Sequence, residues 1–191
     1  SERGLGGNDT DLELRLRRWR SEGGKRADAA RGLTRRWAAL TVPPLKGRGD
    51  IAACVALAFP DRVAKRRDAA GADWISVGGR GFRLDPTSPL ARADWLAVAE
   101  VGGAAAGARI LSAATLDPAV IENLFADRIA TGTELRFDPA AGTVRAAHGR
   151  RLGAILLSGG QDSRAEPAAI AAALLEGVRA HGLHLLPWSE G

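Results

Sequence analysis

The chain has 191 residues, of which 46% are hydrophobic, so it can bury a core and is not disordered by composition. Its net charge of +5 is uneven: residues 1–70 hold 16 Lys and Arg against 9 Asp and Glu, whereas residues 71–191 hold 11 against 13. The basic first third favours an anionic partner.

Cysteine content and hydropathy limit the cellular compartment and the kinds of site that the chain can have. Cys54 is the only cysteine, which excludes an internal disulfide and a cysteine metal cluster and fits a cytoplasmic protein. No apolar run approaches the roughly 20 residues that span a bilayer, so no membrane partner is expected. The sequence contains no Met, which predicts a segment of a longer protein.

The first 60 residues have the periodicity of helices. Residues 10–20 are predicted to form one helix, in which Thr10 and Glu13 make a capping box. Residues 25–41 form a second helix after a Gly-Gly turn, so the two make a helical hairpin. The second helix carries an apolar stripe with three- and four-residue spacing, made of Ala30, Leu33, Trp37 and Leu40.

Prolines and an aspartate N-cap define where the second helix ends and where the third helix begins and ends. Pro43-Pro44 ends the second helix, and Asp50 is the expected N-cap of a third. This third helix is almost wholly apolar, so we expect it to be buried, and Pro60 interrupts it. A short basic turn over residues 61–67 should follow.

From residue 72 onward the pattern is that of short strands. A Gly-rich turn at residues 78–81 joins the first two strands in a hairpin, and Asp117-Pro118 opens a helix. Pro167 opens a last helix that Gly182 closes, before an extended tail over residues 183–188. The predicted strands cover residues 74–77, 82–84, 95–101, 109–115, 134–137, 143–147 and 151–157. Helices followed by short strands predict an α+β fold with a small barrel such as the OB-fold.

The sequence lacks the motifs of common catalytic sites. It has no Gly-x-x-x-x-Gly-Lys-Ser/Thr loop to hold phosphates and no Gly-x-Ser-x-Gly elbow to present a nucleophile. His181 and His184 have ligand-like spacing, but Gly182 ends the helix between them, so no metal site is expected. We therefore assign no catalytic residue to the chain, and a stand-alone enzyme is disfavoured.

Several stretches resemble one protein family in order along the chain. They are Ser1-Glu2-Arg3 with residues 11–16 (DLELRL), residues 56–67 (ALAFPDRVAKRR), Gly79-Arg80-Gly81, residues 95–99 (WLAVA), residues 151–154 (RLGA), residues 174–179 (LLEGVR) and residues 186–188 (LPW). Together they resemble the region that follows the two ATPase domains in the HrpB family of bacterial DEAH-box ATP-dependent RNA helicases.

The resemblance implies a domain order and a set of partners. Residues 1–60 would be a helical, ratchet-like segment, residues 61–130 an OB-like domain, and residues 131–191 a linking β-α segment. In related helicases the ratchet and OB domains border the RNA channel, so RNA and the missing helicase core domains are the expected partners. The family's motor lies upstream, so ATP and Mg²⁺ are expected in the parent protein and no cofactor is expected in this segment.

Basic residues around the first hairpin form the candidate nucleic-acid-binding set: Lys65, Arg66, Arg67, Arg80 and Arg83. Such residues can neutralise phosphates, or they can form a solvated surface or a contact with the motor domains. Trp74 and Trp95 are interpreted mainly as core residues, with base stacking as the alternative. Two functions stay open: an accessory nucleic-acid-binding region, or an interdomain or protein-interaction scaffold without direct RNA contact.

Overall fold

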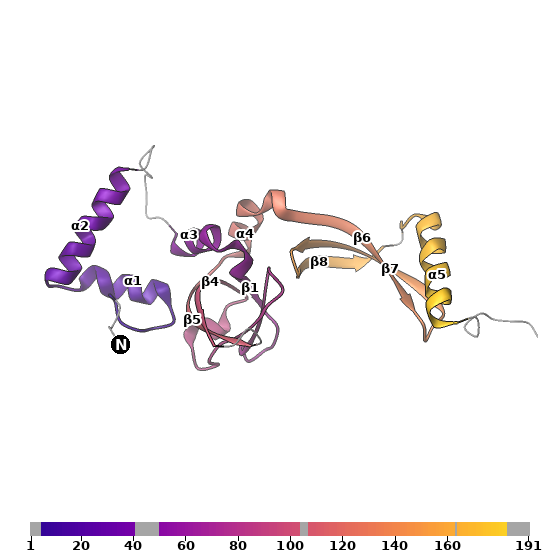
Figure 1. Cartoon of the computed structure of the whole chain (residues 1–191), viewed down its shortest axis with the longest axis horizontal. Helices are drawn as coiled ribbons and strands as arrows, with labels where there is room; N and C mark the ends of the chain where they lie inside the picture. The colour runs from indigo at the N-terminus through magenta and orange to yellow at the C-terminus, as the bar shows by residue number, and fades with distance from the viewer. Residues whose placement is uncertain (1–4, 41–49, 104–106, 163, 183–191) are drawn as a thin grey trace, which may run out of the picture. The chain divides into compact units, whose positions relative to one another are not determined.

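The computed structural model describes residues 5–40, 50–103, 107–162 and 164–182 (Figure 1). They fold into two compact units: the first holds the described residues up to 126 together with 153–155, and the second holds the rest. Mixed helices and strands confirm the α+β class. Pro43-Pro44, His184 and the tail at 183–188 lie outside the described residues.

A closed barrel of five strands forms the centre of the first unit (Figure 1). Its strands are β1 (Val63–Arg66), β2 (Asp73–Ser76), β3 (Gly81–Arg83), β4 (Trp95–Gly102) and β5 (Ala108–Thr115), in the order β1-β2-β3-β5-β4. All neighbouring strands are antiparallel except β3 and β5, which are parallel. The predicted small barrel and the hairpin β2–β3 are therefore confirmed.

The barrel interior is apolar because alternate residues of each strand point inward. Ala64, Trp74, Phe82, Leu96 and Val98 belong to its core cluster, all at most 2% exposed. The Trp74 indole Nε1 donates a hydrogen bond of 2.8 Å to the Gly71 carbonyl oxygen, so its polar atom is satisfied.

The basic turn predicted at residues 61–67 is wrong. A short 3-10 helix at Pro60–Arg62 leads directly into β1, which pairs with β2 on one side and β4 on the other. Local charge suggested a turn, but Val63 and Ala64 are fully buried, and long-range pairing makes this segment a strand.

Helix α1 (Leu12–Ser21) is attached to the barrel, since the Ala113 N–H of β5 donates to the Thr10 carbonyl oxygen at 2.9 Å. The predicted capping box is wrong. Asp11 is the N-cap, and its carboxylate accepts hydrogen bonds from the N–H groups of Glu13 and Leu14 at 2.8 and 3.2 Å. The helix thus starts one residue later than a Thr10 cap would place it.

Helix α2 (Lys25–Ala39) confirms the second predicted helix, but part of its apolar stripe is exposed to solvent. Trp37 is 62% exposed and Leu40 79% exposed, and Ala27 is the only buried residue of α2.

Helix α3 (Ile51–Ala58) begins after the predicted N-cap Asp50. The expectation that α3 is buried holds only for Ala52 and Ala56, since Leu57 on its other face is exposed.

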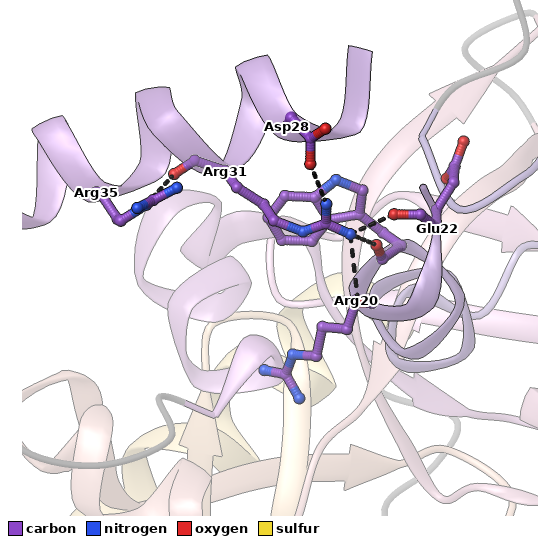
Figure 2. Close-up of polar contacts among 6 residues, drawn as sticks. Arg20, Glu22, Asp28, Arg31 and Arg35 are labelled. Carbon is purple, nitrogen blue, oxygen red and sulfur yellow. Dashed lines mark hydrogen bonds and ion pairs between the residues drawn. The ribbon is translucent and has the colours of Figure 1, made fainter. Parts of the chain in front are cut away.

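An arginine ties α2 to the end of α1 (Figure 2). The Arg31 Nη2 atom donates to the carbonyl oxygens of Trp19 at 3.2 Å, Arg20 at 3.3 Å, and Glu22. Its Nη1 atom binds the Asp28 carboxylate at 2.8 Å. Because the last carbonyls of a helix have no partner within it, one guanidinium caps α1 and fixes its junction with α2. We call this contact the Arg31 clamp.

The second unit is a three-stranded sheet with one helix. Its strands are β6 (Ile129–Asp138), β7 (Thr143–Leu152) and β8 (Ile155–Gln161), in that order, and its helix is α5 (Pro167–His181). Helix α4 (Pro118–Leu124) of the first unit precedes β6, with Asp117 as N-cap as predicted. The strands predicted at residues 134–137 and 143–147 lie within the antiparallel pair β6 and β7, and the last helix, which ends at Gly182, is confirmed.

The predicted single strand at residues 151–157 is wrong. Gly153 has a φ of +54° and turns the chain between β7 and β8. A Cβ atom at Gly153 would lie 2.3 Å from the Val77 carbonyl oxygen, and the Ala154 N–H donates to that oxygen at 2.9 Å. Glycine is therefore required by both conformation and space.

Candidate nucleic-acid interface

One end of the barrel carries cations on its outer surface. The Arg67 N–H, just after β1, donates to the Asp73 carbonyl oxygen at 2.8 Å, and Asp73 is the register partner of Arg83. Arg83 is in turn the register partner of Arg109 across the parallel β3–β5 pair. We call Arg67, Arg83 and Arg109, with the carboxylates Asp73 and Asp85, the basic rim.

The basic rim is only partly neutralised by its own carboxylates. Arg83 Nη1 lies 2.8 Å from Asp73 Oδ1, and Arg109 Nη2 lies 3.9 Å from Asp85 Oδ2. Hydrogen bonds from the Thr87 hydroxyl and N–H, with a smaller effect of Arg109, hold the pKa of Asp85 below its usual value. Exposed ion pairs of this kind are weak and open easily, so the three guanidinium groups remain accessible to an anion.

Two of the sequence-predicted residues, Arg66 and Lys65, have partners within the barrel. The half-buried Arg66 binds Asp94 Oδ1 at 2.6 Å through Nη2 and donates to the Ala91 carbonyl oxygen at 3.4 Å. The Lys65 ammonium lies 5.5 Å from the centroid of the Trp95 ring, which its side chain helps to cover.

Arg80 lies apart from the basic rim. It occupies the turn between β2 and β3, where its N–H donates to the Ser76 hydroxyl at 3.0 Å. Its side chain is exposed. Arg80 and Arg83 are three residues apart along an extended segment, which separates them by about 10 Å. The five predicted residues therefore do not form one cluster.

The barrel presents no base-stacking surface among the residues that the structure describes. Trp74, Phe82 and Trp95 are 1%, 2% and 6% exposed. Their burial confirms that both tryptophans are core residues, and base stacking on these two rings is thereby excluded. The exposed Trp of the described chain is Trp37, on α2.

Sequence reasoning missed two groups of cations. Arg109 alternates with the buried Ala108 and Ile110, so strand parity points it outward. Arg17 and Arg20, one turn apart on α1, line a groove of about 610 Å³ together with Leu16, Asp50 and Ile51. Helical spacing is the signal that would have linked the two arginines, but only the folded chain brings Asp50 beside them.

Within the described ranges, no three His, Cys, Asp or Glu side chains gather as metal ligands. His181 stacks against Phe137, with ring centroids 5.7 Å apart. No helix in the described part of the chain is long and apolar enough to cross a membrane.

No family model matches the sequence. A search of curated proteins finds a similar protein, "ATP-dependent RNA helicase HrpB" of Escherichia coli (strain K12), 29% identical over 141 residues, or 73% of this chain and 17% of that protein.

Two solved structures of HrpB from E. coli have a similar fold. One, described as a DExH-box NTPase, has a TM-score of 0.67 and 25% identity over 96% of this chain and 22% of its own. The other, described as a DEAH/RHA helicase, has a TM-score of 0.62 and 22% identity over 95% of this chain. The chain spans about a fifth of the length of these relatives and is similar to the C-terminal region of HrpB, which confirms the resemblance noted in the sequence.

Proposed function

We propose that this chain is an accessory RNA-binding region of a cytoplasmic DEAH-box helicase. The observation that carries the proposal is the similarity to HrpB over nearly the whole chain, combined with the exposed guanidinium groups of the basic rim. The α1–α2 segment would correspond to the ratchet-like part and the barrel to an OB-like domain, whose strand surface binds oligonucleotides in other proteins.

The proposed contact is with phosphates. The buried aromatic rings of the barrel leave charge as its main means of binding, so affinity should be weak, indifferent to sequence and steeply dependent on salt. Arg67, Arg83 and Arg109 would bind the backbone, with Arg80 as a second contact. Lys65 and Arg66 would support the barrel, because both already have partners within it.

Fluorescence anisotropy with a labelled single-stranded RNA at several salt concentrations tests this proposal. Each neutralised phosphate contributes about 0.7 to the slope of log K against log salt. Replacing Arg67, Arg83 and Arg109 together by Ala should therefore flatten the slope by about 2.

The matched control replaces Arg145, Arg164 and Arg179 of the second unit by Ala. It removes the same charge from exposed positions, so a general charge effect would appear in both variants. Equal slopes for the two folded variants, checked by circular dichroism, would contradict the proposal that the basic rim binds phosphate.

ATP hydrolysis is proposed to belong to the rest of the parent protein, where ATP and Mg²⁺ would bind. We expect the isolated chain to release no phosphate from ATP with or without RNA, because its sequence has no phosphate-binding loop. Hydrolysis that survives repeated purification would contradict this assignment.

A second function is favoured by the open face of α2. Trp37 and Leu40 are exposed, and Leu33 lies one turn before Trp37 on the same stripe. Exposed apolar stripes with an aromatic anchor commonly mark protein interfaces, so this face would dock onto helicase core domains or another protein. The test is titration of the separately prepared core domains of an HrpB-type helicase with the chain, following Trp fluorescence.

Trp37→Ala should weaken docking by tenfold or more, as expected of an aromatic hot spot. Leu57→Ala, at an exposed apolar position on α3, is the matched control and should leave docking unchanged. If Trp37→Ala lowers RNA affinity while core-domain binding persists, the α2 face belongs to the RNA surface instead.

A further inference from the structure

The outer edge of β6 is an unpaired strand edge in the described part of the chain. The sheet order β6-β7-β8 leaves β6 at one side, and its ten residues make a long strand (Figure 1). An edge of this length presents a row of backbone donors and acceptors that can pair with another strand. We call it the β6 edge.

Charges of alternating sign lie on one face of the β6 edge. Phe137 faces α5, because a Cβ at Gly177 would come within 2.2 Å of its ring. Side chains alternate along a strand, so Glu134, Arg136 and Asp138 lie on the face away from α5. This face carries a carboxylate, a guanidinium and a carboxylate in succession.

Arg136 is poorly matched within its own sheet. Its register partner on β7 is Arg145, so two like charges lie directly opposite each other. Arg145 is bound to Asp138 at 3.0 Å, and Glu134 is bound to Arg151 at 3.4 Å. Among the described residues, Arg136 alone of this charged face has no ion-pair partner. A carboxylate supplied across the β6 edge would correct this mismatch.

We propose that the β6 edge pairs with the β6 edge of a second copy of this chain. In a two-fold antiparallel pair, direct partners lie on the same face, so the axis passes through one residue. When that residue is Leu135, Glu134 of each strand lies opposite the partner's Arg136, and Thr133 lies opposite the partner's Phe137. The sheet becomes six-stranded, and two opposite-charge pairs form across the axis.

Other registers lack this complementarity or most of the overlap. An axis at Phe137 places Arg136 opposite the partner's Asp138, but only residues 136–138 of the two strands would then overlap. An axis at Glu134 or at Arg136 places two identical charges opposite each other. An axis at Thr133 places Glu134 opposite Gly132 and Arg136 opposite Ala130, with no charge pair. Only the axis at Leu135 both overlaps residues 132–138 and pairs opposite charges, so in a pair of two copies the sequence of β6 favours this one register.

Disulfide trapping tests the register in the full chain with Cys54→Ser. Leu135→Cys places two thiols next to the axis, within the Cα separation that a disulfide allows. Thr131→Cys, on the same face, would lie roughly 26 Å from its copy in this register and is the matched control. Leu135→Cys should form the covalent dimer at least roughly tenfold faster under mild oxidation. Equal rates for the two variants would overturn the proposal.

Charge reversal gives a second test that leaves the half-buried Leu135 intact. Sedimentation velocity of the native chain should show reversible dimerisation that weakens with salt. Glu134→Arg or Arg136→Glu alone should weaken the dimer by roughly tenfold, since each turns two attractive pairs into repulsive ones. The double variant should recover within about threefold of the native chain, because the pairs re-form with exchanged signs. A native chain that stays monomeric at all concentrations, or a double variant as weak as the single ones, would overturn the proposal.

Discussion

The barrel and the α1–α2 segment belong to the same unit but are stabilised in different ways. In the barrel, Leu96, Val98 and Ala113 have no exposed surface, and apolar burial dominates. In α1 no residue is buried, in α2 only Ala27 is, and the two helices are joined by the Arg31 clamp. The comparison teaches that the barrel carries its own core, whereas the α1–α2 segment relies on polar capping and leaves its apolar stripe for another surface.

The largest expected difference between the two regions comes from their tryptophans. Trp74→Ala should lower the free energy of unfolding by about 3–5 kcal/mol, because it empties the barrel core. Trp37→Ala should change it by about 0.5 kcal/mol or less, because that ring is exposed. Urea denaturation of both variants measures the contrast, and similar losses would show that α2 shares the barrel's core.

Glycines sharpen the same contrast. Gly71 in the barrel unit has a φ of +72°, and a Cβ there would lie 2.1 Å from the Ala91 carbonyl oxygen. Gly24 before α2 has a φ of +102° but nothing within 4 Å of the same position. Both substitutions by Ala cost conformational strain of about 1–3 kcal/mol, and Gly71→Ala adds a steric clash. Thermal unfolding should therefore rank Gly71→Ala as the more damaging, and the reverse order would contradict a rigid barrel loop.

Sequence periodicity predicted the strands of the barrel well, but it did not predict which partners its charged residues contact. Alternation identified β2 and β5, and a continuous apolar run identified β4, whose first four residues are all buried. The same method took residues 61–67 for a turn, since what makes β1 a strand is its pairing with residues 74–76 and 95–97, far along the chain. Whether Arg66 meets Asp94 or an external phosphate is likewise decided by distant residues. Sequence proximity alone therefore grouped five basic residues that the fold separates.

A smaller effect should follow from removing the Arg31 clamp. Arg31→Ala frees three carbonyl oxygens at the end of α1, and we expect about 1 kcal/mol of local stability to be lost. Hydrogen exchange should quicken in α1 and α2 while the barrel amides keep their protection. Arg35→Ala is the matched control, since among the described residues Arg35 donates to the Arg31 carbonyl of the same helix and to no group of α1. Faster exchange in the barrel as well would mean that the two regions unfold together.

The smallest expected effect is the change in stability of the two regions as the pH is lowered. The pKa of Asp85 is lowered in the folded barrel, chiefly by the Thr87 hydroxyl, so this contact stabilises the fold above the unfolded-state pKa and is lost as pH falls through the folded one. The Nη2 contacts of the Arg31 clamp are with backbone carbonyls, which do not titrate. An NMR titration should show the Thr87 amide shifting below the pH at which an ordinary aspartate protonates, with the Trp19 amide near the clamped end of α1 unchanged. Asp85→Asn should abolish that shift.

The closure of the barrel has a consequence for how the chain is made. Strand β1 pairs with β2 early, but its other edge stays open until residues 95–97 of β4 have been synthesised. At about 5–20 residues per second, this interval lasts on the order of seconds, long enough for an exposed edge to meet another nascent chain. Charged residues on an open strand edge oppose such encounters. In the finished barrel, Lys65 covers Trp95 and Arg66 binds Asp94. Before β4 has been synthesised, we expect the charges of these two residues to oppose aggregation of the incomplete barrel.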